Sequence, residues 1–481
     1  MNNSETKQLG GKQQKPILLA VLLLVVVVCG GIGAAVLVGG GVPMVKVDFD
    51  NVIGTFKSLN GINNGPKSGY SENEDGTSEW ALDVTDIYND LGISFVRLHD
   101  TEYPYGGECF VDIHCIFPDE DADVDDPDSY DFSCTDEYIA NIKETSAEIL
   151  YRLGESISES SDNLVYTHPP EDYEKWAQVC EHIIRHYNEG WANGYYYDIQ
   201  YWEIWNEPDV NRQWSGTMEQ YYEMYKVTAR YLKECYPDIM VGGGALGSAT
   251  EETVSAFLEG ICDDGEDTPL DFFSWHLYTT TAEEIAIYAN TVRDTLDSYG
   301  YSDTLSFLDE WNYVTGWDSD SLTTTWEVIH SYAAASFYTS CLITMQNSPV
   351  DSAMYYDGQY AFLAYWNGLY TSEDDLSSGY YAFDFFNQLC ETGQQVEVSV
   401  DETLDSVYCC AAAGDGKGVL LTNVSYDKVK LSLCLYTGVK NATVTKVNAS
   451  NPDGVTETET WLRDCVSITL SAYETMYIAL Q

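Results

Sequence analysis

The sequence predicts an α/β fold: a (β/α)₈ TIM barrel with a smaller C-terminal β-sandwich domain and an N-terminal transmembrane segment. Three patterns in the 481 residues favour this fold class. Eight strand-like runs alternate with helical patterns, short alternating runs begin near residue 393, and a long apolar run lies before residue 39. The expected domains are 1–44 for the N-terminal segment, 45–392 for the barrel and 393–481 for the sandwich.

The barrel is predicted from eight β-rich runs, at 58–64, 93–100, 147–156, 199–208, 238–247, 271–279, 305–313 and 352–359. Strands that alternate with helices predict a parallel sheet. Eight such units over roughly 330 residues fit a closed barrel, and the alternative is a doubly wound open sheet. A barrel brings the C-terminal strand ends to one mouth, where active sites lie. Polar residues gather at these ends: Arg97, His99, Glu155, Asn206, Glu207, His276, Tyr278, Glu310 and Asp357.

Helix signals lie between the runs. Apolar residues recur with a 3.6-residue period at Trp176, Cys180, Ile183, Ile184 and Tyr187, which predicts an amphipathic helix. Thr217 with Gln220, and Thr281 with Glu284, match the capping box that satisfies orphan amides at a helix start.

The C-terminal region has a different pattern. Seven short runs, from QVEVSV to TMYIAL, alternate apolar and polar residues and are separated by turn residues. They predict a β-sandwich over 393–481. The stretch VKVDFD at 45–50 is a candidate extra strand of this domain.

The N-terminus contains a candidate membrane anchor. Ile17–Val38 holds 22 residues without a charge and follows Lys7, Lys12 and Lys15. A helix of this length spans roughly 33 Å, close to a bilayer core. The preceding lysines predict that residues 1–16 stay in the cytoplasm and that the bulk of the chain lies outside. We therefore expect a single-pass cell-membrane protein, or a secreted one if the segment is a cleaved signal peptide.

The charge excludes several partners. The chain has 78 acidic and 22 basic residues and a net charge of -56, which disfavours nucleic acids and anionic membranes. The 38 tyrosines and 12 tryptophans are residue types common at sugar sites, because a flat ring packs on a pyranose face.

Three motifs resemble cofactor or metal sites, and the sequence argues against each of them. GGGALG at 242–247 fits a dinucleotide loop, but Asp271 begins the next strand instead of ending it. His182 and His186 are four apart but lack a third ligand. The acidic stretch 118–131 lacks the glycine and the glutamate that a calcium loop needs. We predict no cofactor and no metal.

Two strand ends carry the residues for chemistry. YWEIWNEPDV at 201–210 places Glu207 directly after an apolar strand, where a carboxylate costs desolvation unless it is used or paired. LDEWN places Glu310 at the end of another strand. Two such carboxyl groups are what hydrolysis of a glycosidic bond needs. Asp309 is the alternative to Glu310, and neighbours on a strand are expected to point to opposite sides.

These motifs carry a resemblance. WEIWNEPD on the fourth strand with FLDEWN on the seventh resembles the clan A glycoside hydrolases, most of all family 39, which includes β-xylosidases and α-L-iduronidases. LNGINNGP, FVRLHD and SWHLYT extend the similarity, so that it covers residues 45–481.

The resemblance implies roles for nine residues. Glu207 would be the general acid/base and Glu310 the nucleophile of a retaining mechanism. The remaining residues would hold the nucleophile or bind the sugar: Arg97, His99, Asp100, Asn206, His276, Tyr278 and Trp311. Arg97 and Tyr278 would hold Glu310, Asn206 would bind the sugar 2-hydroxyl, and Trp311 would form a wall. Asp100 departs from family xylosidases, which often have glycine there. An added carboxylate would repel a uronate and argues against iduronidase activity.

The resemblance therefore implies a β-xylosidase-like exo-glycosidase that acts on extracellular oligo- or polysaccharides. The alternatives are arabinofuranosidase, galactosidase, glucosidase or iduronidase specificity. A different class of alternative is a non-catalytic carbohydrate-binding surface protein.

The membrane prediction has a direct test. If Ile17–Val38 is an uncleaved anchor, cell fractionation will find the full-length protein in the membrane, with its C-terminal part open to external protease. Soluble protein that starts near residue 40 would instead establish a cleaved signal.

Overall fold

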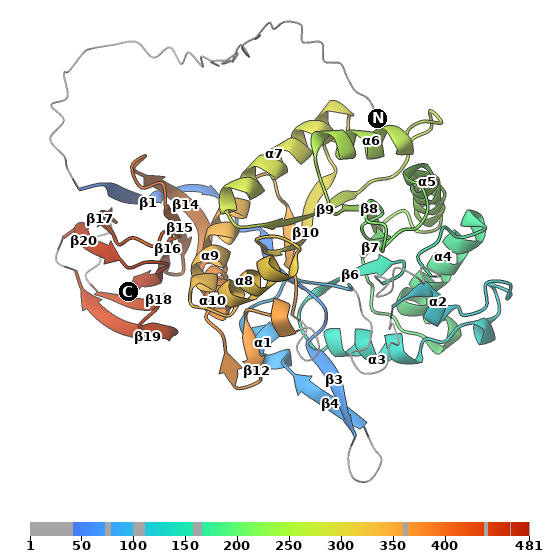
Figure 1. The fold of residues 1–481 in the computed structure, drawn as a ribbon, viewed down its shortest axis with the longest axis horizontal. Coiled ribbons are helices and arrows are strands. Elements are labelled where there is room, and N and C mark those ends of the chain that lie inside the picture. Colours follow the sequence, from blue (N-terminus) through green and yellow to red (C-terminus); the bar gives the residue numbers. More distant parts are fainter. Residues whose placement is uncertain are drawn as a thin grey trace, which may run out of the picture. The chain divides into compact units, whose positions relative to one another are not determined.

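The fold is seen in a computed structural model that describes residues 42–72, 78–99, 111–156, 166–358, 364–436, 441–461 and 463–480 (Figure 1). Its main part is a closed barrel of eight parallel strands. The strands are β2 (Ser58–Asn63), β5 (Phe95–Arg97), β6 (Glu148–Leu153), β7 (Tyr201–Ile204), β8 (Met240–Leu246), β9 (Phe272–Thr279), β10 (Leu305–Tyr313) and β11 (Ser352–Tyr355). Each lies within one predicted run, so the prediction of a (β/α)₈ barrel is confirmed.

Helices follow the strands and lie around the barrel (Figure 1). They are α1 (Thr85–Asp90), α2 (Ile113–Ile116), α3 (Ser133–Ile142), α4 (Tyr173–Glu189), α5 (Met218–Cys235), α6 (Glu251–Ile261), α7 (Ala282–Ser298), α8 (Ser319–Ile329), α9 (Ala333–Gln346) and α10 (Tyr380–Thr392). Short 3₁₀ turns are η1 (Pro127–Ser129), η2 (Trp191–Asn193) and η3 (Ala364–Trp366). Two hairpins join the barrel loops, β3 (Lys67–Glu72) with β4 (Ser78–Asp83) and β12 (Tyr370–Ser372) with β13 (Asp375–Leu376).

The helix signals are confirmed in two cases and wrong in one. All five apolar residues predicted for the helix at 176–187 are buried in α4. Thr217 and Gln220 form the predicted capping box of α5. Thr281 precedes α7 without a side-chain cap, because Glu284 accepts a hydrogen bond from the Thr279 hydroxyl instead.

A ring of large side chains fills the interior of the barrel below its mouth. The ring consists of Phe95, Leu150, Phe272, Phe307 and Met354, one from each of five strands. The rings of Phe272 and Phe307 are stacked with their centroids 4.8 Å apart. This apolar layer closes the barrel from below, so the polar side chains at the C-terminal strand ends have a rigid floor.

The glycines of β8 have a packing role. A Cβ atom added to Gly242 would lie 2.3 Å from the Phe272 carbonyl oxygen, and one added to Gly243 would lie 2.9 Å from the Tyr225 ring. The motif GGGALG therefore lies largely inside a barrel strand that approaches its neighbours closely, whereas a dinucleotide loop follows its strand.

The C-terminal domain is one continuous sheet of nine strands in the order β19-β18-β21-β16-β15-β14-β1-β17-β20. The strands are β1 (Met44–Gly54), β14 (Gly393–Val400), β15 (Val407–Gly414), β16 (Lys417–Asn423), β17 (Val429–Cys434), β18 (Asn441–Asn448), β19 (Asn451–Thr460), β20 (Cys465–Leu470) and β21 (Thr475–Leu480). Side chains from β17 and from β18 share one buried apolar cluster, so the sheet folds over its own core as a sandwich does. Cys434 and Cys465 form a disulfide between β17 and β20.

The sheet packs on the barrel through α9 and α10. The Phe385 and Tyr477 rings stack with centroids 5.5 Å apart. Ser336 Oγ donates to the Asn423 carbonyl oxygen at 3.0 Å, and Gln346 Nε2 donates to Gln395 Oε1 at 2.8 Å. Apolar and polar contacts together fix the two parts of Val42–Gln481 as one compact unit.

The predicted membrane segment Ile17–Val38 lies outside the described residues. Among the helices that the structure does describe, none has the length and apolar character needed to cross a bilayer. The anchor therefore stays a prediction.

Close packing at β8 gives a stability prediction. Gly242→Ala forces a methyl group against the Phe272 carbonyl oxygen, and overpacking of this kind costs ~1–3 kcal/mol. Gly54→Ala is the matched control, because nothing lies within 4 Å of its added Cβ atom. Thermal unfolding followed by circular dichroism should show a lower midpoint for Gly242→Ala alone. Equal midpoints in the two variants would contradict the packing argument.

Candidate active site

Arg97 at the end of β5 is the centre of a buried cluster at the barrel mouth. Its Nε atom lies 2.8 Å from Glu203 Oε2 and 2.9 Å from Asp309 Oδ2. Its Nη1 atom lies 3.2 Å from Glu310 Oε2, and Nη2 donates to Asn206 Oδ1 at 2.7 Å. One guanidinium thus orients side chains from β7, β10 and the turn after β7.

Two of the buried carboxyl groups around Arg97 differ in the direction in which their pKa is shifted. Burial raises the pKa of Asp309 well above its ordinary value; the charge of Arg97 opposes this shift, and the charges of Glu203 and Glu310 add to it. Burial acts on Glu203 too, but Arg97 holds the pKa of Glu203 below its ordinary value. Burial alone would lower the pKa of Arg97, and the three carboxyl groups raise it. Burial thus favours the protonated form of Asp309, which lessens the negative charge around the guanidinium.

A bulge in β10 brings two neighbouring carboxyl groups to the same cation. Leu308 pairs with Trp275 and Glu310 pairs with His276, so Asp309 is an extra residue in the ladder. A bulge interrupts the alternation of side chains along a strand. The expectation that Asp309 and Glu310 point to opposite sides is therefore wrong: both contact Arg97.

Glu310 has a donor on each oxygen. The Tyr278 hydroxyl donates to Oε1, and Arg97 Nη1 donates to Oε2. His99 Nε2 lies 3.5 Å from Oε2. Burial, together with the charge of Glu310, raises the pKa of Tyr278 well above its ordinary value, so this phenol keeps its proton. The surroundings of Glu310 stabilise a negative charge.

Glu207 lies in a tight turn between β7 and α5. Its φ of 40° is in the left-handed region, and its N–H donates to the Ala245 carbonyl at 2.9 Å. Asp209 holds the turn against β8 by accepting from the N–H groups of Gly247 and Ser248 at 3.0 and 3.1 Å. The Glu207 side chain is therefore held at the mouth by backbone contacts on both sides.

His276 lies between the two glutamates. Its Nδ1 atom is 2.9 Å from Glu207 Oε1 and 3.6 Å from Glu310 Oε2. Burial lowers the pKa of His276 to about 4, because the opposing charge of Glu310 is outweighed. The imidazole is therefore neutral near pH 7, and with its proton on Nδ1 it donates to Glu207.

The three side chains Glu207, His276 and Glu310 offer atoms that all lie within 4.8 Å of one another. This spacing would suit a metal ion, but the contacts oppose one. Arg97 already places a positive charge 3.2 Å from Glu310 Oε2, and Tyr278 occupies the other oxygen. The arrangement is instead that of two neighbouring carboxyl groups that both lie close to a neutral histidine.

Comparison with known proteins agrees with this geometry. A family model described as Glycosyl hydrolases family 39 matches residues 61–365, well over half of the chain. The chain belongs to glycosyl hydrolase family 39. It is 33% identical over 117 residues to a β-xylosidase of Geobacillus stearothermophilus, covering 24% of this chain and 22% of that protein. It is 26% identical over 212 residues to a β-xylosidase of Caldicellulosiruptor saccharolyticus, covering 42% and 40%. The matches thus span less than half the length of these relatives.

Among solved structures, a glucosidase from Croceicoccus marinus is similar over 92% of this chain and 99% of its own, with a TM-score of 0.70 and 21% identity. At this identity the likeness shows the shared fold of barrel and C-terminal sheet.

The structure places most of the residues that the family 39 motifs predicted in one cluster. Arg97, His99, His276 and Tyr278 surround Glu310, and Asn206 contacts Arg97. Asp100 lies outside the described residues.

The structure corrects the prediction that Trp311 forms a wall of the site. It is buried at 1% exposure and packs against Tyr355 and Phe383, with ring centroids 5.6 and 6.3 Å away. Because it follows Glu310 directly on β10, it faces the helices outside the barrel. It is a core residue and does not form a wall of the site.

Three further residues support the cluster and were not predicted. Asn63 Oδ1 accepts from Arg97 at 3.2 Å, and its Nδ2 donates to the Asp309 carbonyl at 2.9 Å. Glu203 pairs with Arg97, and Asp209 anchors the Glu207 turn. The one sequence signal was Glu203 itself, a carboxylate inside an apolar strand that needs a buried cation.

The buried His276 gives a pH prediction. Its pKa is about 4 in the folded chain against 6.5 ordinarily. Between these values the unfolded state binds more protons, so His276 makes the free energy of unfolding fall as pH drops from 6.5 to 4. ¹⁵N NMR, assigned with His276→Asn, should show a ring that stays neutral down to about pH 5. A midpoint near 6.5 would contradict the burial argument.

Proposed function

We propose that this family 39 chain is a retaining glycosidase that removes a terminal sugar, with β-xylosidase-like specificity. The observation that carries the proposal is the distance between its two catalytic candidates: carboxylate oxygens of Glu207 and Glu310 lie within 4.8 Å of each other. Retaining enzymes have their carboxyl groups ~5–5.5 Å apart, whereas inverting enzymes leave ~6.5–9.5 Å for a water molecule.

The surroundings of the two glutamates support different roles. Glu310, with donors from Arg97 and Tyr278, attacks the anomeric carbon as a carboxylate and forms a glycosyl ester. Glu207 gives its proton to the leaving glycosidic oxygen in the same step. In the second step Glu207 takes a proton from water, and the resulting hydroxide displaces Glu310 from the anomeric carbon. Neutral His276 contacts Glu207 without adding a charge.

Sugar contacts follow from the donors around this pair. Asn206 Nδ2 is buried and has no hydrogen-bond partner among the described residues, while its Oδ1 is fixed by Arg97. It is thus a held donor beside Glu207, suited to the sugar 2-hydroxyl. The β-xylosidases of Geobacillus stearothermophilus and Caldicellulosiruptor saccharolyticus support xylose as the sugar.

Glucosidase activity is the second candidate, because the Croceicoccus marinus structure is that of a glucosidase. Arabinofuranosidase, galactosidase and iduronidase activities rank lower. A non-catalytic carbohydrate-binding protein has no need for two carboxyl groups at this distance. We also propose that the enzyme works outside the cell, held at the membrane by Ile17–Val38 or secreted after cleavage there.

A panel of nitrophenyl glycosides tests the activity. Wild-type protein should give its highest kcat/KM with the β-D-xyloside, and Glu207→Ala and Glu310→Ala should each lower the rate, Glu207→Ala by about 10²–10⁴-fold because it removes the acid/base. Activity that is highest on the β-D-glucoside would favour the second candidate. No hydrolysis of any glycoside would overturn the proposal.

Azide then separates the roles of the two glutamates. In Glu207→Ala the ester still forms from an activated aryl glycoside, and azide enters from the vacated face to give a product of retained configuration. In Glu310→Ala no ester forms, and azide gives inverted product. Reversed stereochemistry would exchange the roles. Asp309→Asn is the matched control, because an amide of the same shape replaces a carboxyl group whose raised pKa favours the protonated form. This variant should not need azide.

A further inference from the structure

A cavity of about 310 Å³ lies beside the C-terminal end of β6. Neither Glu207 nor Glu310 lines it. Phe117, Trp176 and Trp205 contribute apolar walls, and His114, Glu155 and Tyr166 contribute polar groups. The volume is at the small end of the ~300–1,000 Å³ range of ligand sites, so the cavity suits a small ligand and not a long chain.

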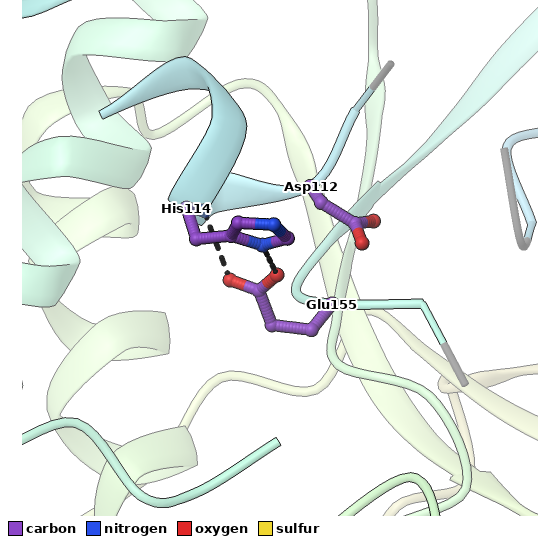
Figure 2. Close-up of side chains that lie close together, drawn as sticks. All are labelled: Asp112, His114 and Glu155. Atoms are coloured by element: carbon purple, nitrogen blue, oxygen red, sulfur yellow. Dashed lines mark hydrogen bonds and ion pairs between the residues drawn. The ribbon is translucent and has the colours of Figure 1, made fainter. Parts of the chain in front are cut away.

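The polar cluster at this cavity resembles a metal site, but its contacts oppose one. Asp112, His114 and Glu155 lie close together (Figure 2). Asp112 is already used: Oδ1 accepts from Arg152 at 2.7 Å and Oδ2 from the Ser156 N–H at 2.7 Å. A metal ion at Asp112 would lie against the Arg152 cation. The carboxylate that remains for a ligand is that of Glu155.

Glu155 is held rigidly by His114. The His114 N–H donates to Oε1 at 3.0 Å, and the ring Nδ1 contacts Oε2 (Figure 2). Each oxygen of a carboxylate accepts about two hydrogen bonds, so each retains one acceptor position. Glu155 is buried, with 6% exposure, and this burial raises its pKa to about 7. Above that pH it is a preorganised double acceptor for hydroxyl groups at the edge of the cavity.

Aromatic rings supply flat surfaces next to this acceptor. The Tyr166 ring stacks on His114 at 3.6 Å with an angle of 11°, and it is 54% exposed. Trp176 and Trp205 lie on the buried side, with their ring centroids 6.3 Å apart. A carboxylate acceptor among aromatic faces matches the two surfaces of a sugar ring, its hydroxyl edge and its C–H face.

The charge of the lining selects against anions. Five carboxyl groups line the cavity against one lysine and two histidines. The lysine, Lys175, already donates to the Glu120 carbonyl and lies 5.7 Å over the Phe117 ring. A phosphate or a uronate would meet a net negative surface, so the ligand is not an anion, and a neutral sugar is compatible with the lining.

We propose that this cavity is an accessory sugar site, which binds one neutral sugar through Glu155 and the faces of Tyr166 and Trp176. The proposal rests on the proposed function for its class of ligand. The sugar is either a distal unit of the glycan substrate or a free sugar.

Binding to catalytically silent protein is the first test. Titration of Glu310→Ala protein with xylobiose and with cellobiose, followed by calorimetry, should show two sites for at least one of these neutral probes. Adding Tyr166→Ala should weaken one site roughly two- to tenfold, and adding Glu155→Gln should weaken it about tenfold or more. Tyr426→Ala, an exposed tyrosine of the C-terminal sheet domain at 77% exposure, is the matched control. Glucuronate should not bind at this site. A single site for both probes, or two sites unaffected by Tyr166→Ala and Glu155→Gln, would overturn the proposal.

Kinetics distinguish the two sources of the sugar. If the site binds a distal unit, Tyr166→Ala lowers kcat/KM on xylotetraose relative to that on nitrophenyl xyloside, whereas Tyr426→Ala leaves the ratio unchanged. An unchanged ratio with loss of the second calorimetric site assigns the cavity to a free sugar. The two proposals can also fail separately. If Tyr166→Ala removes the second calorimetric site but the wild-type protein hydrolyses no glycoside, the accessory site is supported and the proposed function is wrong.

Discussion

The pairing of Arg97 with the carboxyl groups around it is the constraint on which the barrel mouth depends. Removing a guanidinium from water costs free energy unless several acceptors surround it. Around Arg97 these acceptors are Glu203, Asp309, Glu310 and Asn206. These residues come from two strands and one turn. Removing Arg97 would leave buried negative charges unpaired, so the same contact that positions Glu310 also keeps the strand ends together.

The raised pKa of Asp309 lessens the negative charge that the adjacent carboxyl groups place around one cation. With three ionised carboxylates, a single guanidinium would face an excess of buried negative charge, which is costly without further pairing. Because burial favours the protonated form of Asp309, the guanidinium of Arg97 is left to pair mainly with Glu203 and Glu310. His276 adds no positive charge to this cluster near pH 7, because burial lowers its pKa to about 4.

The fold and the two glutamates were predictable because they depend on local patterns. Apolar strands followed by polar residues indicate C-terminal strand ends, and a closed barrel brings these ends together. The wrong predictions arise where a strand departs from the regular two-residue alternation of its side chains, or where that alternation was not applied. The amino-acid sequence gives no sign of the bulge at Asp309, so the side to which Asp309 points was predicted wrongly. Trp311 was assigned to the site from the family resemblance, although the residue after Glu310 on the strand faces the other way. Asn63 and Asp209 were missed because their partners are distant in sequence or are backbone groups.

The position of β1 makes the C-terminal sheet domain discontinuous in the chain. Val45 pairs with Val400 on β14, so roughly 350 residues must be synthesised between them, which takes about 20–70 s at typical rates. During this interval the whole barrel sequence leaves the ribosome while β1 has no partner strand. The apolar Val45, Val47 and Phe49 alternate along β1 with the charged Lys46, Asp48 and Asp50. Charges at alternate positions oppose pairing with other chains, and they keep this strand available until its C-terminal partners exist.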